Sequence, residues 1–437
     1  LKTMKNSFRV LVLLLLSTAC YAQEKLNLQQ AVELTLQNNY DIQLRSNQLN
    51  VAKNNVSLAN AGIMPLITGN FTNNHSVQNS EQTLANGTQQ QQDNARNANT
   101  NVGINLNWRI FDGFAMFANY NRLQKLQASG ELNFRLTVEN TLAEVMNTYF
   151  DLIRQNQHIH SFLSAVEVSQ IRLKNSQARY SIGKASKLEV LAAKVDLNTD
   201  TTNLLRQQDA FQQAKTQLNL LMGRSLDTDF TVSDTIVLQS TFTYAELLQA
   251  VQTKNPEIRL ADIQQQVAKL SLTQVRASRY PGINVTTGYS FSNSSSALGF
   301  AREATGRGLT YGITASMPLF NGFLQSRNEK NANIGVSSAQ IQFKQTQQRI
   351  EAQLQQAFQA YTTNLVLVSL ETQNKQTAKQ NMDISLEKFR LGSLSAIEFR
   401  EAQLNYVNAS ARTIDAQFQA KQAEIALKQL SGELSVN

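Results

Sequence analysis

Cysteine and proline are almost absent from this chain of 437 residues. Its one cysteine is Cys20, which excludes a disulfide framework and a site with several thiolate ligands. The four prolines are Pro65, Pro256, Pro281 and Pro318. The proline-free stretch 66–255 is rich in alanine, glutamine, leucine and asparagine, which is typical of long helices with much of their surface in water.

Charge and catalytic side chains are also sparse. The formal charge of +8 is spread over the chain without a run of lysine or arginine, which argues against nucleic-acid binding. The three histidines are His75, His158 and His160, and the last two would point in different directions on a helix. The sequence also lacks a glycine-rich phosphate loop. We therefore predict that the protein is not an enzyme and needs no cofactor and no bound metal.

The N-terminal segment has the pattern of a secretory signal peptide. Three basic residues, Lys2, Lys5 and Arg9, precede the apolar run Val10–Leu16, which is too short to span a bilayer. Small residues at Cys20 and Ala22 favour a signal peptide of residues 1–22, and a lipoprotein acylated at Cys20 is the alternative. Beyond it, no apolar stretch approaches about 20 residues, so we expect a periplasmic protein, a secreted protein or an outer-membrane barrel.

The rest of the chain is an internal duplication. At an offset of 216, the recurring residues are Asn39, Ile42, Leu44, Gln48, Val51, Ala52, Lys53 and Pro65. At an offset of 209, they are Phe111, Gly113, Phe114, Asn119, Phe134, Ala143, Gly183, Ser186, Glu189, Ala193, Leu218, Leu221 and Gly223. A period near 210 residues indicates two copies of one large unit. We predict a first repeat over 23–225, a linker over 226–242 and a second repeat over 243–437.

Each repeat contains two segments in which apolar and polar residues alternate. The clear ones are Val102–Ile110, Ile283–Phe291 and Leu309–Met317, with a weaker one at Ile67–Phe71. Each is about 10 residues long, the length of a tilted membrane strand. A soluble β-sandwich is the alternative, but it would need more strands.

The alternation also predicts the two faces of these strands. We expect one set to face lipid: Val102, Ile104, Leu106 and Ile110. We expect the other to face the lumen: Asn105, Asn107 and Arg109. Residues 73–100 and 292–307, rich in Asn, Gln, Ser and Gly, are expected to be surface loops.

The helical segments predict the architecture. A helix from Gly113 to Ser181 would be about 100 Å long, while Lys187–Met222 and Tyr40–Gly62 would be about 54 Å and 35 Å. One long helix is thus paired with two shorter ones, with residues 26–38 bridging the gap. Four strands cannot close a barrel, and open edges are not tolerated in lipid. We therefore expect three chains to share a twelve-stranded barrel.

Prolines and glycines mark the boundaries of these elements. Pro65 and Pro281 stand where a helix gives way to a strand, and Gly113 and Gly322 where a strand gives way to a helix. We expect these four barrel-to-tunnel transitions to have a structural role. Ser186 with Glu189, and Ser395 with Glu398, have the spacing of capping boxes that begin the return helices.

Several motifs resemble the TolC-type outer-membrane efflux protein family. They are NWRIFDGF (107–114), RYSIGKASKLEV (179–190), KNPEIRLA (254–261), SMPLFNGF (316–323) and FRLGSLSAIEF (389–399). The resemblance implies an α+β membrane protein, a trimer whose shared β-barrel continues into a long α-helical periplasmic tunnel. It also implies an outer-membrane location and two partners, a periplasmic adaptor (membrane fusion) protein and an inner-membrane transporter.

The resemblance also implies functional residues at the end of the helices farthest from the strands. The adaptor would dock at the two turns, on Gly183, Lys184, Gly392, Ser393 and Leu394. Carboxylates one helical turn apart ring the closed periplasmic mouth in that family, and Glu398 and Glu401 fall on these positions with Glu in place of Asp. Arg400 between them could pair with a neighbouring chain. The alternative is that Glu398 is only a helix cap and Glu401 a surface charge.

The leading function is therefore a passive exit duct of a tripartite efflux pump or a type I secretion system. The alternatives are a trimeric surface adhesin with a barrel anchor and a soluble coiled-coil scaffold. An adhesin would carry its barrel at one end of the chain, whereas strands and helices interleave twice here. The alternating strands argue against the scaffold.

Overall fold

The computed structural model describes residues 24–232, 235–238, 242–297 and 301–434, so the expected signal peptide lies outside the described residues. The chain divides into two compact units, each assembled from separate stretches of sequence. The sheet unit contains residues 47–133 and 259–346, and the helical unit contains residues up to 46, 134–258 and 347–437.

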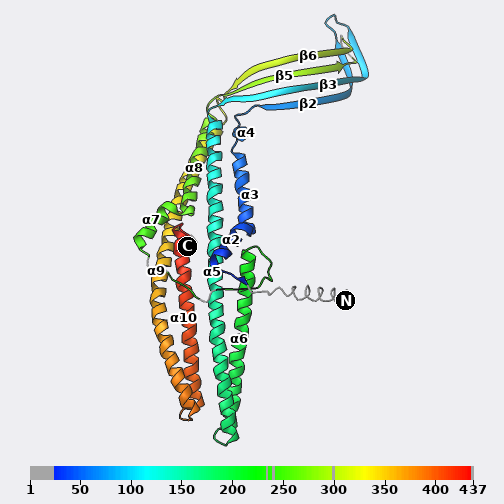
Figure 1. Ribbon diagram of the computed structural model, residues 1–437. Coiled ribbons are helices and arrows are strands. Elements are labelled where there is room, and N and C mark those ends of the chain that lie inside the picture. The colour runs from blue at the N-terminus through cyan, green and yellow to red at the C-terminus, as the bar shows by residue number, and fades with distance from the viewer. Residues whose placement is uncertain (1–23, 233–234, 239–241, 298–300, 435–437) are drawn as a thin grey trace, which may run out of the picture. The chain divides into compact units, whose positions relative to one another are not determined.

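The sheet unit is built around four antiparallel strands in the order β2-β3-β5-β6 (Figure 1). The strands are β2 (Leu66–Thr83), β3 (Gln89–Asp112), β5 (Gly282–Ser295) and β6 (Glu303–Ser316). Each repeat contributes one hairpin, and β3 joins β5 across the boundary between the repeats. The two outer strands, β2 and β6, form the edges of the sheet.

The prediction of surface loops over residues 73–100 and 292–307 is largely wrong, because the strands of both hairpins extend into these segments. β2 and β3 stay paired from Leu66 opposite Asn107 to Thr83 opposite Gln89, with one register shift between Gln78 and Ser80. Both faces of this extension carry polar side chains, so the apolar alternation disappears while the backbone ladder continues. In the second repeat, β5 ends at Ser295 and β6 begins at Glu303.

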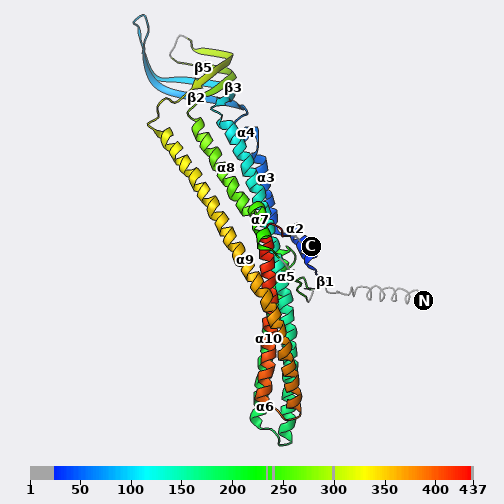
Figure 2. The same cartoon turned by 90° about the vertical axis from the view of Figure 1, so that its left-hand side faces the viewer.

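Two long helices follow the hairpins, as the sequence predicts. α5 (Ala115–Ser181) and α9 (Leu324–Arg390) have 67 residues each, which is about 100 Å of helix. After a tight turn, α6 (Lys187–Leu221) and α10 (Ala396–Leu430) run back as helices of 35 residues (Figure 2). No helix in the described part of the chain is both long enough and apolar enough to cross a membrane.

The shorter helices differ between the repeats. The second has α7 (Tyr244–Lys254) and an unbroken α8 (Pro256–Ala277). The first has α2 (Leu28–Asn38), α3 (Tyr40–Asn55) and α4 (Leu58–Ala61), so the single helix expected over Tyr40–Gly62 is wrong. The break arises because the Ser57 side chain accepts the backbone N–H of Asn60 and starts a new helix.

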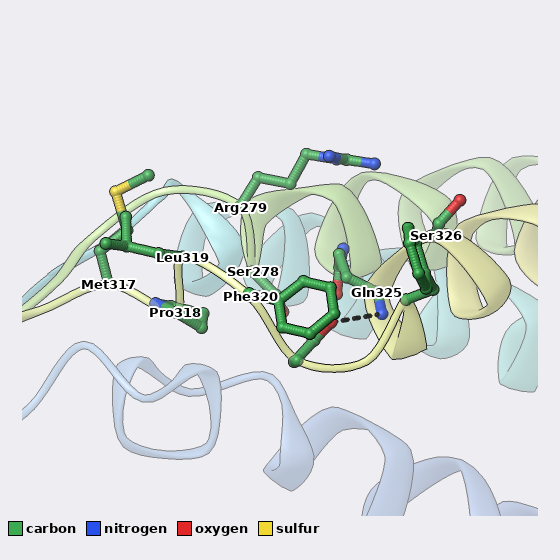
Figure 3. A pocket seen from close by; sticks show the side chains of 10 residues that line it. Ser278, Arg279, Met317, Pro318, Leu319, Phe320, Gln325 and Ser326 are labelled. Carbon is green, nitrogen blue, oxygen red and sulfur yellow. Dashed lines mark hydrogen bonds between the residues drawn. The ribbon is translucent and has the colours of Figure 1, made fainter.

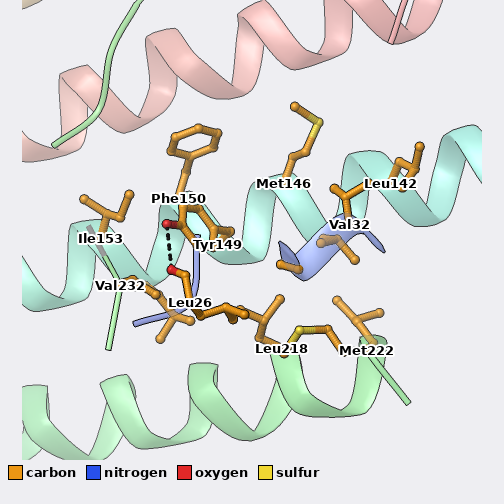
Figure 4. Close-up of a cluster of buried hydrophobic side chains, with 14 of the residues drawn as sticks. Leu26, Val32, Leu142, Met146, Tyr149, Phe150, Ile153, Leu218, Met222 and Val232 are labelled. Carbon is orange, nitrogen blue, oxygen red and sulfur yellow. Dashed lines mark hydrogen bonds between the residues drawn. The ribbon is translucent and has the colours of Figure 1, made fainter. Parts of the chain in front are cut away.

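The main hydrophobic core lies in the helical unit, where α2, α5 and α6 meet (Figure 4). Leu152 and Leu218 are fully buried there. The short strand β1 (Glu24–Lys25) pairs with β4 (Phe230–Thr231) beside it. The Tyr149 hydroxyl donates to the Leu26 carbonyl at 3.2 Å, which ties the N-terminal segment to α5.

Leu152→Ala is expected to destabilise this core by about 2–5 kcal/mol, because it removes buried methyl groups and leaves a cavity. Leu163→Ala on the same helix is the matched control, since Leu163 is 44% exposed whereas Leu152 is fully buried. Thermal unfolding followed by circular dichroism should show a lower midpoint for the first variant only. Equal midpoints for the two variants would contradict the assignment of the core.

Candidate functional site

The four-stranded sheet has one apolar and one polar face. Residues directly opposite each other in an antiparallel pair project from the same face. The apolar face contains the pairs Phe71 with Val102, Ile104 with Tyr289, and Val285 with Ile313. The polar face contains the pairs Asn70 with Gly103, Asn107 with Thr286, and Thr310 with Gly288. Such a sheet suits a boundary between lipid and water.

Side chains on the polar face bond to one another across the strands. Asn105 donates from its amide to Asn70 Oδ1 at 2.8 Å, and Arg109 donates to Asn284 Oδ1 at 3.3 Å. Gly288 lies opposite Asn105, and a Cβ at Gly288 would come within 2.4 Å of the Asn105 side chain. Glycine at this position therefore makes room for the amide network on the polar face.

The strict alternation in β3 ends at Ile110. The pairing with β5 shifts between Arg109 and Phe111, so that Phe111 lies opposite Ile283. Ile283 belongs to the apolar face, and Phe111 therefore continues that face in place of Ile110. A bulge of this kind is invisible to a period-two pattern, which is why the sequence pointed to Ile110.

Three of the four transition residues lie at the ends of strands. Pro65 and Pro281 directly precede β2 and β5. Gly113 directly follows β3, whereas Gly322 lies beyond the end of β6, in the turn before α9. Both have positive φ angles, of 71° and 64°. The residues after them, Phe114 and Phe323, also have positive φ, which strains a non-glycine backbone.

The two strand-to-helix junctions differ in how they are filled. In the first repeat, the Trp108 indole donates to the Ile63 carbonyl at 2.8 Å. In the second repeat Met317 takes the place of Trp108, and a cavity of about 270 Å³ lies there, bounded by Ser278, Phe320 and Gln325 among others (Figure 3). The second junction thus has a cavity beside Met317, the counterpart of Trp108.

Both helical turns end in the same motif. Gly183 and Gly392 have φ angles of 71° and 78°, and the following N–H groups, of Lys184 and Ser393, donate to carbonyls five residues back. Leu394 is half-buried, and the other four candidate docking residues are exposed. Apolar side chains are exposed beside them: Ile182, Leu188, Leu391 and Ile397.

The two expected capping boxes have different structures. Glu398 accepts from the Ser395 backbone N–H at 3.0 Å and from its hydroxyl at 2.7 Å, which completes the box. These two hydrogen bonds lower the pKa of Glu398. In the first repeat the Glu189 side chain turns away and accepts from Ser176 at 3.2 Å, so the box there is incomplete. Glu401 lies on the exposed side of α10.

The sequence suggested that Arg400 could pair with a neighbouring chain, but in the structure it pairs within its own chain. Its guanidinium makes two hydrogen bonds to the Asp200 carboxylate on α6, at 2.7 Å and 3.0 Å. Asp200 is buried and also accepts from the Ser169 hydroxyl of α5 at 2.5 Å. Beside it, Arg172 donates to Asp196 at 2.6 Å. The two helical hairpins of one chain are therefore joined through a buried ionic network.

A second polar cluster joins α5 to α10 in the same unit, farther along these helices from the two turns. Asp415 lies 3.1 Å from His158 Nε2 and 3.2 Å from an Arg154 nitrogen. Burial acts to raise the pKa of Asp415, but the hydrogen bond and charge of His158, together with Arg154, outweigh it and lower the pKa. Neither network was predicted from the sequence. The sequence carries no signal for them, because α6 has charged residues along its whole length and their spacing does not show that Asp200 is the buried one.

Comparison with known proteins identifies the family. The model of the outer membrane efflux protein family matches residues 31–224 and again residues 247–433. The chain belongs to this family. Its α+β fold is the TolC-like fold, and it is an outer-membrane efflux channel with a periplasmic tunnel, not an enzyme. Channels of this family are trimeric and work with an adaptor and an inner-membrane transporter.

Individual relatives are distant. Protein CyaE of Bordetella pertussis is 21% identical over 353 residues, 77% of this efflux protein and 71% of CyaE. The cation efflux system protein CusC of Escherichia coli K12 is 23% identical over 333 residues, 70% of this chain and 69% of CusC. The structure of the Campylobacter jejuni CmeC outer membrane channel superposes with a TM-score of 0.81 at 14% identity, covering 93% of this chain and 85% of CmeC.

In this efflux protein, Arg400→Ala is expected to destabilise the helical unit by about 3–5 kcal/mol, because it leaves the buried Asp200 carboxylate without its cation. The control is Arg412→Ala, which breaks an ion pair with Glu371 whose arginine is exposed and should cost at most about 1 kcal/mol. Unfolding midpoints of the two variants provide the comparison. Adding Asp200→Ala to Arg400→Ala should restore part of the loss; a further loss would contradict the pairing.

Proposed function

We propose that three copies of this chain close one barrel of twelve strands above a passive helical duct. The observation that carries this proposal is the amphipathic four-stranded sheet with two open edges, β2 and β6. Its polar face would line the water-filled lumen and its apolar face would contact lipid. Transport through such a duct requires no chemistry from the chain itself.

We also propose that the adaptor docks at the two helical turns. Each turn exposes a glycine that has a positive φ angle and is flanked by exposed apolar residues, Ile182 and Leu188 at the first turn and Leu391 and Ile397 at the second. Apolar side chains exposed around a small residue form a shallow surface that a partner can approach closely. The two turns differ in sequence: Lys184 corresponds to Ser393, and Leu394 corresponds to Ala185. A trimer would therefore offer two kinds of docking site in alternation.

Replacing both Gly183 and Gly392 with tryptophan is expected to abolish export, because a bulky side chain would block the approach of the adaptor. A drug-susceptibility assay measures export, and gel mobility without heating shows whether the trimer remains in the membrane. Gly87→Trp at the β2–β3 turn is the control, since Gly87 also has a positive φ angle, of 83°. Normal export by the double variant would place docking elsewhere.

We further propose that Glu401, with Glu398, forms the entrance ring of the duct. The two residues are three apart on α10, and three copies would bring six carboxylates together. Glu401 is exposed, so its carboxylate could face the duct. The two hydrogen bonds from Ser395 fix the Glu398 carboxylate at the start of α10. Rings of carboxylates attract cations in channels.

Glu401→Gln is expected to reduce cation selectivity and to weaken block by divalent cations added on the periplasmic side. Single-channel recording in planar bilayers measures both properties. Ser395→Ala is the matched control, because it removes the cap of α10 and leaves both carboxylates in place. If Glu401→Gln and Glu398→Gln together leave selectivity and block unchanged, the entrance ring is excluded.

A further inference from the structure

A polar cavity lies in the helical unit, at a distance from both turns. It has a volume of about 420 Å³ and is bounded by α5, α9 and α10 (Figure 2). All the residues that line it belong to the helical unit. Its α5 side, at Gln157–Ser164, is about 30 Å along that helix from the first turn. A cavity of this size suits a small organic molecule.

Hydrogen bonds beside the cavity hold its three helices together. The Gln403 amide of α10 donates to the Ala165 carbonyl of α5 at 3.0 Å. The Thr413 hydroxyl of α10 donates to the Glu371 carbonyl of α9 at 2.9 Å. The cavity is therefore formed by the chain itself, and a ligand would not have to bring the helices together.

The lining of the cavity favours a negatively charged ligand. Side chains that can donate hydrogen bonds line it, among them Ser161, Ser164, Tyr406, His160 and Lys375. No described residue of the lining carries a carboxylate, and Lys375 forms no ion pair with a described residue. Asp415, the acidic residue of this part of α10, is already paired with Arg154 and His158. The ammonium group of Lys375 therefore lacks a counter-charge at the cavity.

A buried hydroxyl at the cavity lacks a hydrogen-bond partner. Ser410 lines the cavity and is only 4% exposed. Its hydroxyl makes no hydrogen bond with any residue that the structure describes. A buried polar group without a partner costs free energy, and such groups are rare in folded proteins. An acceptor atom bound in the cavity would satisfy this hydroxyl.

The internal duplication shows that these polar side chains are not needed for helix packing. The helices of the two repeats correspond at an offset of 209, with α5 matching α9 and α6 matching α10 over their full lengths. At this offset the counterparts are apolar: Val166 for Lys375, Leu197 for Tyr406 and Leu370 for Ser161. The same helical framework thus accommodates apolar residues at these positions. The second repeat has polar ones where they meet around the cavity.

We propose that this cavity binds a small organic anion through a carboxylate or phosphate group. Lys375 supplies the positive charge, and the hydroxyls of Ser410 and Tyr406 donate to the oxygens of the anion. The α5–α6 hairpin contributes one wall and the α9–α10 hairpin the other two, so the bound anion bridges the two hairpins. The site is separate from the two turns and from Glu401, and it depends neither on adaptor docking nor on the entrance ring.

Equilibrium dialysis of the purified trimer against radiolabelled phosphate or malonate, at constant ionic strength, tests the site. One anion should bind per chain. Lys375→Gln should weaken binding at least about tenfold, because it removes a charged hydrogen-bond donor. Ser410→Ala should weaken it about threefold, because it removes a neutral one. Binding is measured in place of thermal stability, since phosphate also stabilises proteins by exclusion from their surface.

Lys379→Gln is the matched control. Lys379 lies one turn farther along α9, is exposed and does not line the cavity, so this variant loses the same charge and should bind as the wild type does. Lys375→Val introduces the residue that the first repeat has at this position, and should bind as weakly as Lys375→Gln. Gel mobility without heating shows that each variant still forms the trimer.

The two anions also distinguish the two possible ligand groups. Tighter binding of phosphate than of malonate would identify a phosphate ligand, and the opposite order a carboxylate ligand. The proposal is overturned if neither anion binds the wild-type trimer, or if Lys379→Gln weakens binding as much as Lys375→Gln does. Ser410→Ala, which removes a single hydroxyl, keeps the test decisive if a Lys375 variant fails to assemble: unchanged binding by it would also overturn the proposal.

Discussion

A backbone N–H or C=O group inside a lipid bilayer must have a hydrogen-bond partner, because no water is present to supply one. In this chain the four-stranded sheet satisfies that requirement along β3 and β5 and leaves it unmet along β2 and β6. The single chain is therefore incomplete as a membrane structure. Each long helix follows an outgoing strand in the sequence, α5 after β3 and α9 after β6.

The duplication explains how one chain can meet this constraint with few specific residues. Two hairpins related by a fixed offset pair with each other in one register, and the same surfaces remain available at the two outer edges. Small residues recur where backbones approach closely, as at Gly113 against Ala277 and at Gly223 against Asn38. The repeated parts carry the architecture, and the residues that differ between repeats are free to acquire separate roles.

Most of the architecture could be predicted from the sequence, because it depends on periodicity. The 67-residue helices, the amphipathic strands and the glycine turns all leave regular patterns. The hairpin extension beyond Phe71 could not be predicted, because side chains that are polar on both faces carry no alternation. The helix break at Ser57 and the bulge at Ile110 depend on single hydrogen bonds and one extra residue.

The candidate site was harder to predict, because it depends on individual side-chain contacts that leave no periodic pattern. Arg400 seemed available for a neighbouring chain because sequence spacing does not show which helix it packs against. The structure places it on Asp200, and Glu398 on Ser395, so two of the charges near the turn are already satisfied within the chain. Glu401 has Ala192 as its counterpart in the first repeat. Glu401 is thus a carboxylate that the repeated architecture does not require, and it is exposed beside two charged residues that are engaged within the chain, as the proposed entrance ring needs.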